Sequence, residues 1–134
     1  MSAMSDFLED ALRAHIFRTA TYAKPTSLTV HLFTAAPGET GGGTEVTGGS
    51  YAAVTRAPLD ANWTAPDTTG GLTDNAAALT YPSPTANWGS VTHTAIKDES
   101  ANFLVYGALT TPKTVNNGDP APAFGIGALD VTFA

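Results

Sequence analysis

Short segments of alternating apolar and polar residues, each closed by glycine or proline, constrain the fold of this chain most. The clearest spans residues 28–34, where Leu28, Val30 and Leu32 share one face and Pro37-Gly38 follows. Alternation with a period of two is typical of half-buried β-strands, and glycine and proline mark the turns between them. About six or seven such segments recur at a spacing of roughly 10–15 residues, which is the pattern of an antiparallel sandwich or barrel.

The remaining strands are expected over residues 50–56, 75–81, 91–96, 103–109 and 129–133. Residues 103–109 carry apolar side chains on both faces, which predicts a central strand. Residues 98–100 read as a turn, and Asn117-Gly118 is a hairpin-type turn signal.

One helix is expected at the N-terminus, over residues 5–20. Ser5 is a good N-cap, and Asp6, Glu9 and Asp10 favour the positive end of the helix dipole. Apolar residues recur at three- and four-residue spacing and give one stripe. Beyond residue 20, β-branched threonines and Lys24-Pro25 favour extended backbone.

These elements predict a mainly β fold: an antiparallel β-sandwich, jelly-roll-like, with one N-terminal α-helix. A length of 134 residues suits a single domain over residues 1–134, with the helix at 5–20 and the sandwich at 26–134. The chain has no cysteine, so its core is expected to hold without disulfides.

Charge is scarce, and its distribution excludes several classes of partner. Charged residues make up 13% of the chain, about half the usual share, and the net charge is −6. A neutral, hydroxyl-rich surface suits permanent packing against neighbours, because few charges need desolvation. The six Lys and Arg residues are scattered singly, so we expect no nucleic-acid binding. Apolar runs are too short for a membrane span, and the acidic N-terminus does not resemble a signal peptide.

A catalytic, metal or cofactor site is not expected, so the chain is predicted not to be an enzyme. His15 lies on the helix stripe, while His31 and His93 lie in strands and would approach each other if those strands pair. Two histidines without a third ligand make a weak zinc site. Asp98-Glu99 reads as a solvated turn, and other acidic residues have turn-forming neighbours. The glycines at 41–43 lack the Lys-Ser/Thr pair of a phosphate-binding loop.

Candidate contact surfaces are the helix stripe and the tryptophans. The expected assembly or surface-contact residues are Phe7, Leu8, Leu12, Ile16, Trp63 and Trp88. The two tryptophans also fit a carbohydrate-stacking platform, because aromatic rings offer flat apolar faces with a polar handle. Filling the ends of the sandwich is the commoner role for such rings and is the preferred interpretation.

Five blocks of the sequence resemble a family of small tailed-bacteriophage proteins that are usually labelled phage tail fibre proteins. These blocks keep the family's order over nearly the whole chain and span residues 7–12, 28–37, 43–51, 86–93 and 106–115. Residues 120–127, rich in proline and glycine, depart from the family pattern. The resemblance implies no catalytic residues in this chain.

The resemblance implies a structural component of a bacteriophage virion, of the tail fibre or tail-associated type. Such a protein would form homo-oligomers, bind other virion proteins of the tail or capsid, and be assembled in the bacterial cytoplasm. Two alternatives stay open: a capsid decoration (cement) protein that stabilises the head shell, and a receptor- or glycan-binding module.

Overall fold

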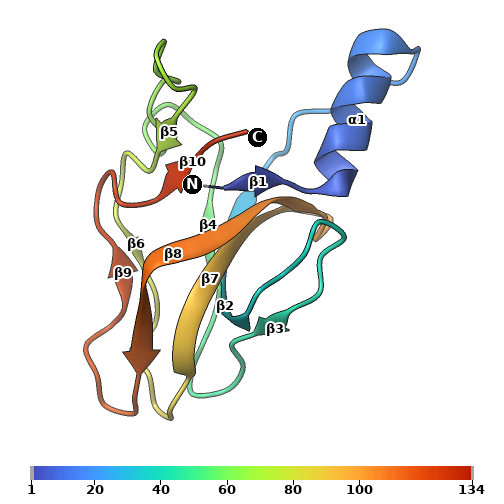
Figure 1. Cartoon of the computed structure of the whole chain (residues 1–134). Helices are drawn as coiled ribbons and strands as arrows, with labels where there is room; N and C mark the ends of the chain where they lie inside the picture. The colour runs from blue at the N-terminus through green and yellow to red at the C-terminus, as the bar shows by residue number, and fades with distance from the viewer. Residues whose placement is uncertain (1, 134) are drawn as a thin grey trace.

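The fold is built on one antiparallel sheet, seen in a computed structural model that describes residues 2–133 (Figure 1). Its strand order is β1-β8-β7-β2-β3, with β4 also paired to β2. The strands are β1 (Ala3–Met4), β2 (Leu28–Ala35), β3 (Thr44–Glu45), β4 (Val54–Arg56), β7 (Gly89–Asp98) and β8 (Phe103–Val115). The long strands β2, β7 and β8 form the centre.

Two short ribbons form a second layer beside this sheet. They are β6 (Leu79–Thr80) with β9 (Ala123–Phe124), and β5 (Thr73–Asp74) with β10 (Asp130–Val131), both antiparallel. Figure 1 shows them stacked along one side of the main sheet. The fold is therefore mainly β and antiparallel, consistent with a β-sandwich, as the alternating segments predicted.

The core lies between the two layers. Val30, Leu32 and Ile96 of the sheet are buried in one cluster with Leu79 and Leu129 of the second layer. Aromatic rings continue this cluster: Tyr81 stacks on Tyr51 at 6.3 Å between ring centroids. Burial of these side chains supplies the main stabilisation, at about 25 cal/mol per Å² of apolar surface.

The predicted turn at residues 98–100 connects β7 and β8, the longest strands. The Asp98 carboxylate accepts hydrogen bonds from the backbone N–H groups of Ser100 and Asn102, both at 2.9 Å. Strand β8 runs six residues beyond its expected end and pairs Lys113 with Val91 past a bulge. Three threonines and Val115 make up most of this extension, and β-branched residues favour extended backbone.

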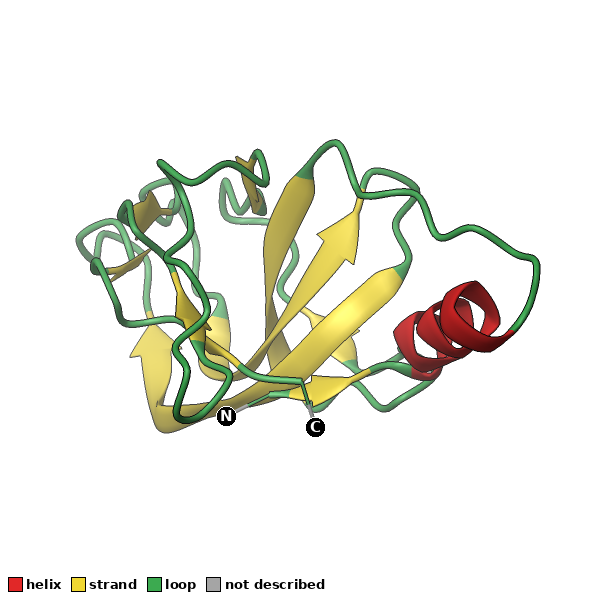
Figure 2. Ribbon diagram, turned by 90° about the horizontal axis from the view of Figure 1, so that it is seen from above, coloured by secondary structure: helices red, strands yellow, loops and turns green. Residues whose placement is uncertain are grey.

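The helix α1 (Asp6–Phe17) is shorter than the expected 5–20. Ser5 is the N-cap as predicted, and its side chain accepts from the Leu8 backbone N–H. The helix ends at Phe17 because Arg18 takes extended backbone angles, and the Tyr22 N–H bonds the His15 ring. Figure 2 shows α1 beyond the edge of the sheet, on the opposite side from the second layer.

Three sequence-based expectations need correction. The strand expected at 50–56 begins at Val54, because Ser50 has a positive φ of 63°. The strand expected at 75–81 is reduced to β6, because the buried Asn75 side chain bonds the Ala77 carbonyl and bends the segment. Asn117-Gly118 forms a turn, but the strands on either side of it do not pair, so it closes no hairpin.

Within residues 2–133, none of the helical structure is both long and apolar enough to cross a bilayer.

Candidate assembly surface

Helix α1 is fixed to the sheet through its first turn. The backbone N–H of Ser5 donates to the Leu104 carbonyl at 2.9 Å, and its hydroxyl donates to the Phe103 carbonyl. The Asp6 N–H donates to the Glu39 carbonyl at 3.0 Å. Ser5 is fully buried, so one residue both caps the helix and binds it to β8. The direction of α1 is therefore set at its N-terminus.

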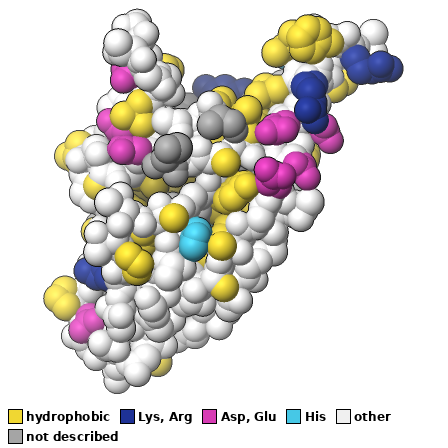
Figure 3. Space-filling model, in the orientation of Figure 1, with side chains coloured by type: hydrophobic (Ala, Val, Ile, Leu, Met, Phe, Trp, Pro, Cys, Tyr) yellow, Lys and Arg dark blue, Asp and Glu magenta, His cyan; other side chains and the backbone are white. Residues whose placement is uncertain are grey.

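The far end of α1 is apolar and exposed. Among the residues of α1, Leu8 alone is buried, and Leu12 packs partly against the core. Ile16 is 66% exposed and Phe17 is 81% exposed. We call Ile16, Phe17 and the following Arg18 the helix tip. Figure 3 shows hydrophobic side chains gathered at this end of the molecule, with cationic side chains beside them.

The acidic residues of α1 lie in its first half, and the basic residues lie toward its C-terminal end. Asp6, Glu9 and Asp10 lie in its first half, next to the sheet. Arg13 forms ion pairs with Asp10 and, at 3.8 Å, with Glu9. Arg18 lies past these pairs and has no carboxylate within ion-pair distance among residues 2–133. The helix tip is thus apolar with a free cation.

The six expected contact residues fall into different environments. Leu8 and Trp88 belong to the core at 4% and 5% exposure, Leu12 and Trp63 are half-buried, and Phe7 and Ile16 are exposed. Phe7 packs edge-on against Tyr22, with ring centroids 6.5 Å apart. Sequence reasoning missed Phe17, because it lies off the apolar stripe that predicted the other helix residues. Their role in assembly stays a prediction.

The Trp88 ring is enclosed by the chain itself. Its Nε1 donates to the Gly49 carbonyl at 2.9 Å, and Tyr51 packs edge-on against it at 5.3 Å. Trp63 is half-buried, and its Nε1 lies out of solvent without a hydrogen-bond partner in the described structure. The two indoles therefore do not form one open stacking platform.

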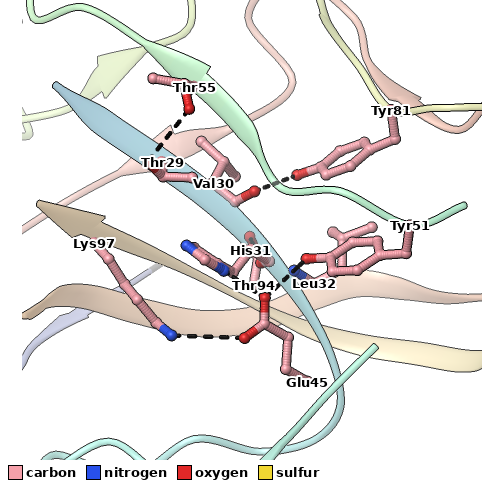
Figure 4. Close-up of polar contacts among 10 residues, drawn as sticks. All are labelled: Thr29, Val30, His31, Leu32, Glu45, Tyr51, Thr55, Tyr81, Thr94 and Lys97. Atoms are coloured by element: carbon pink, nitrogen blue, oxygen red, sulfur yellow. Dashed lines mark hydrogen bonds and ion pairs between the residues drawn. The ribbon is translucent and has the colours of Figure 1, made fainter. Parts of the chain in front are cut away.

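Glu45 on β3 gathers a polar network with Tyr51 and with side chains of the neighbouring strands (Figure 4). Its carboxylate accepts from the His31 ring and, at 3.2 Å, from the Tyr51 hydroxyl. Lys97 Nζ lies 3.6 Å from it and 4.5 Å from the Phe103 ring centroid. Burial lowers the pKa of His31, although Glu45 opposes this shift. Burial also raises the pKa of Tyr51 well above its usual value.

This network has a structural explanation. It attaches the glycine-rich segment 36–50 to strands β2 and β7, because Glu45 bonds the His31 ring of β2 and pairs with Lys97 of β7. His31 and His93 lie on paired strands but two positions out of register, and the His93 ring bonds Thr92 at 2.8 Å. Across residues 2–133, three or more His, Asp or Glu side chains nowhere come together as a metal site would need.

A cavity of about 250 Å³ opens between the sheet and the second layer. Its apolar lining comes from both layers: Leu32, Ile96, Val105, Tyr81, Phe124 and Leu129. Asp130 of β10 also lines it, and Asp130 lies opposite Asp74 of β5 in the strand register. Partial burial and the Asp130 carboxylate raise the pKa of Asp74. We call Asp74 and Asp130 the acidic rim.

Comparison with known proteins identifies the family. A family described as podophage GP4 fiber I protein gp80 matches residues 3–132. The chain belongs to this gp80 family. No curated protein gives a significant match to the chain.

The gp80 match runs from β1 to β10, so it includes α1, both layers and the cavity between them. It confirms the phage tail fibre-type resemblance of the five sequence blocks. The gp80 family is one of fibre proteins, so the chain is a structural virion component of the fibre type.

Proposed function

We propose that this chain is a subunit of a phage tail fibre or tail-attached structure, and that α1 docks it against other virion proteins. One observation carries the proposal: Ile16 and Phe17 are largely exposed at the end of a helix that is rigidly fixed at Ser5. Exposed apolar side chains on a fixed support are typical of interaction sites. The subunit acts by oligomeric assembly and carries out no catalysis.

The low charge of the surface supports permanent assembly. Only 13% of the residues are charged, so contacts between copies and with neighbours need little desolvation of ions. Repetition of one modest contact in a symmetric particle multiplies its effect. Assembly in the bacterial cytoplasm and residence in the virion follow from this role.

Labelling of purified virions tests where the chain lies in the particle. We expect an antibody or a peptide tag on the chain to label the fibres or tail of purified virions in electron microscopy. Labelling of the head shell alone would contradict the proposal and support capsid decoration instead. A phage that carries Phe17→Asp should assemble fewer labelled fibres, whereas Leu59→Asp, at another exposed apolar residue, should not.

A further inference from the structure

Two features of the described residues, 2–133, have no partner among those residues and complement each other. The helix tip presents an exposed phenyl ring beside a free cation, as described above. The cavity between the layers is lined mostly by apolar side chains, and one residue of the acidic rim, Asp130, lines it beside its strand partner Asp74. They lie on separate parts of the molecule, because α1 and the second layer are on opposite sides of the main sheet (Figures 1 and 2).

We propose that the helix tip of one copy inserts Phe17 into the cavity of a second copy and brings Arg18 to its acidic rim. This inference rests on the proposed function and names the partner of α1, a second copy of the same chain.

The size of the cavity fits an aromatic side chain. An apolar cavity of about 150 Å³ is enough to hold benzene. The cavity here measures about 250 Å³ and is lined by aliphatic and aromatic side chains of both layers. It therefore has room for the Phe17 ring and for part of Ile16. Phe17 changes its environment completely on insertion, since it is 81% exposed in the single chain.

The charges at the two surfaces are opposite. Asp74 and Asp130 face each other across two paired strands, and like charges in that arrangement are destabilising. Figure 3 shows acidic side chains where Figure 1 draws β5 and β10, across the molecule from the cations of α1. A cation from a second copy would relieve the repulsion. Lys113 also lines the cavity, but it belongs to the C-terminal end of β8. That end of β8 lies away from β10 in Figure 1.

The contact joins two different surfaces, so it is head-to-tail. Contacts of this kind build rings or open rows, whereas contacts between identical surfaces stop at a pair. Each copy would offer its tip to one neighbour and its cavity to another. A row or ring of copies suits a fibre-type component.

Sedimentation velocity on the purified full chain tests the contact. The wild type should form species that grow with concentration. Phe17→Asp should weaken association at least about tenfold, because burial of a phenyl side chain is lost. Ala128→Phe, and separately Ala123→Phe, should do the same by filling the cavity at exposed lining residues. Leu59→Asp, at an exposed apolar residue that does not line the cavity, is the matched control and should associate like the wild type.

A mixing experiment decides whether the helix tip binds the cavity of a second copy or the helix tip of a second copy. Phe17→Asp retains a cavity and Ala128→Phe retains a tip, so an equimolar mixture should form 1:1 pairs and no larger species. If Ala128→Phe and Ala123→Phe both associate like the wild type, tips pair with tips and the proposal is wrong. A wild type that stays monomeric at about 1 mM, a weak-binding concentration, would also overturn it.

Failure of this inference is distinguishable from failure of the proposed function. Virions that carry the chain in their fibres, combined with a monomeric purified chain, would overturn the inference alone. Head-to-tail association of a chain that is missing from the tail would overturn the function alone. Circular dichroism on each variant should match the wild type, since every substituted residue is exposed.

Discussion

Asn75 joins three parts of the second layer through one side chain. It is fully buried, and its Nδ2 donates to the carbonyls of Ala77 and Gly125 at 2.9 and 2.8 Å. Its Oδ1 accepts from the Leu129 backbone N–H at 2.9 Å. The shape of the layer that closes the cavity therefore depends on this amide.

Asn75→Ala should destabilise the fold by about 2–4 kcal/mol, because it leaves buried backbone groups without partners. Urea unfolding of the purified chain measures the loss. Asn87→Ala is the matched control: Asn87 is exposed and accepts a single bond, from the Asn117 N–H at 2.8 Å. Asn87→Ala should lower the free energy of unfolding by less than about 1 kcal/mol. Equal costs for the two variants would contradict the role of Asn75.

Single residues show where sequence reasoning ends. Ser5 was predictable as an N-cap, because the signal lies within four residues of the helix start. The hydrogen bond that fixes Trp88 in the core was not, because its partner Gly49 lies 39 residues away. Asn75 was expected only as the start of a strand, since its partners at Gly125 and Leu129 are remote in sequence.

The backbone path of the glycine-rich segment before β3 depends most on Gly43. A Cβ on Gly43 would lie 2.7 Å from the Ala35 carbonyl oxygen and 2.7 Å from the Pro37 nitrogen. A Cβ on Gly42 would meet nothing within 4 Å. Both residues have positive φ angles, of 74° and 85°, so they differ mainly in this steric contact.

Gly43→Ala should therefore cost clearly more stability than Gly42→Ala. The positive φ alone costs roughly 1–2 kcal/mol in either variant. The backbone clash at Gly43 adds to this and should displace β3, which carries Glu45. Thermal unfolding compares the two variants, and NMR shifts of His31 report whether Glu45 has moved. A larger loss in Gly42→Ala would contradict the assignment.

Elements were predictable in proportion to their length. Strands β2 and β7 cover the expected segments, because alternation over six or more residues is a strong signal. Strands β1, β3, β5 and β9 have two residues each, too few to show a period, and they form only because a partner strand is present. Helix α1 was expected to be longer, because local propensity did not reveal the bond from Tyr22 to His15.

The two layers meet at a buried and a half-buried phenol, which link the stability of the whole molecule to pH. Tyr81 lies in the core and donates to the Val30 carbonyl at 3.2 Å. Tyr51 stacks on it and bonds both the Leu32 N–H and Glu45. Burial is the main cause that raises the pKa of both phenols well above the usual value.

The raised pKa values predict a loss of stability in alkali. An unfolded tyrosine ionises near pH 10, before the same group in the folded chain, so the unfolded state releases protons first. This contribution to stability is complete below about pH 10 and falls as the pH rises further. Of the four tyrosines, Tyr51 and Tyr81 should ionise only as the chain unfolds, which tyrosinate absorbance recorded with circular dichroism measures. Tyr81→Phe should reduce the slope of unfolding free energy above about pH 10 and cost about 1 kcal/mol at neutral pH. Ionisation of all four tyrosines before any loss of β-structure would show that water reaches the interface between the layers.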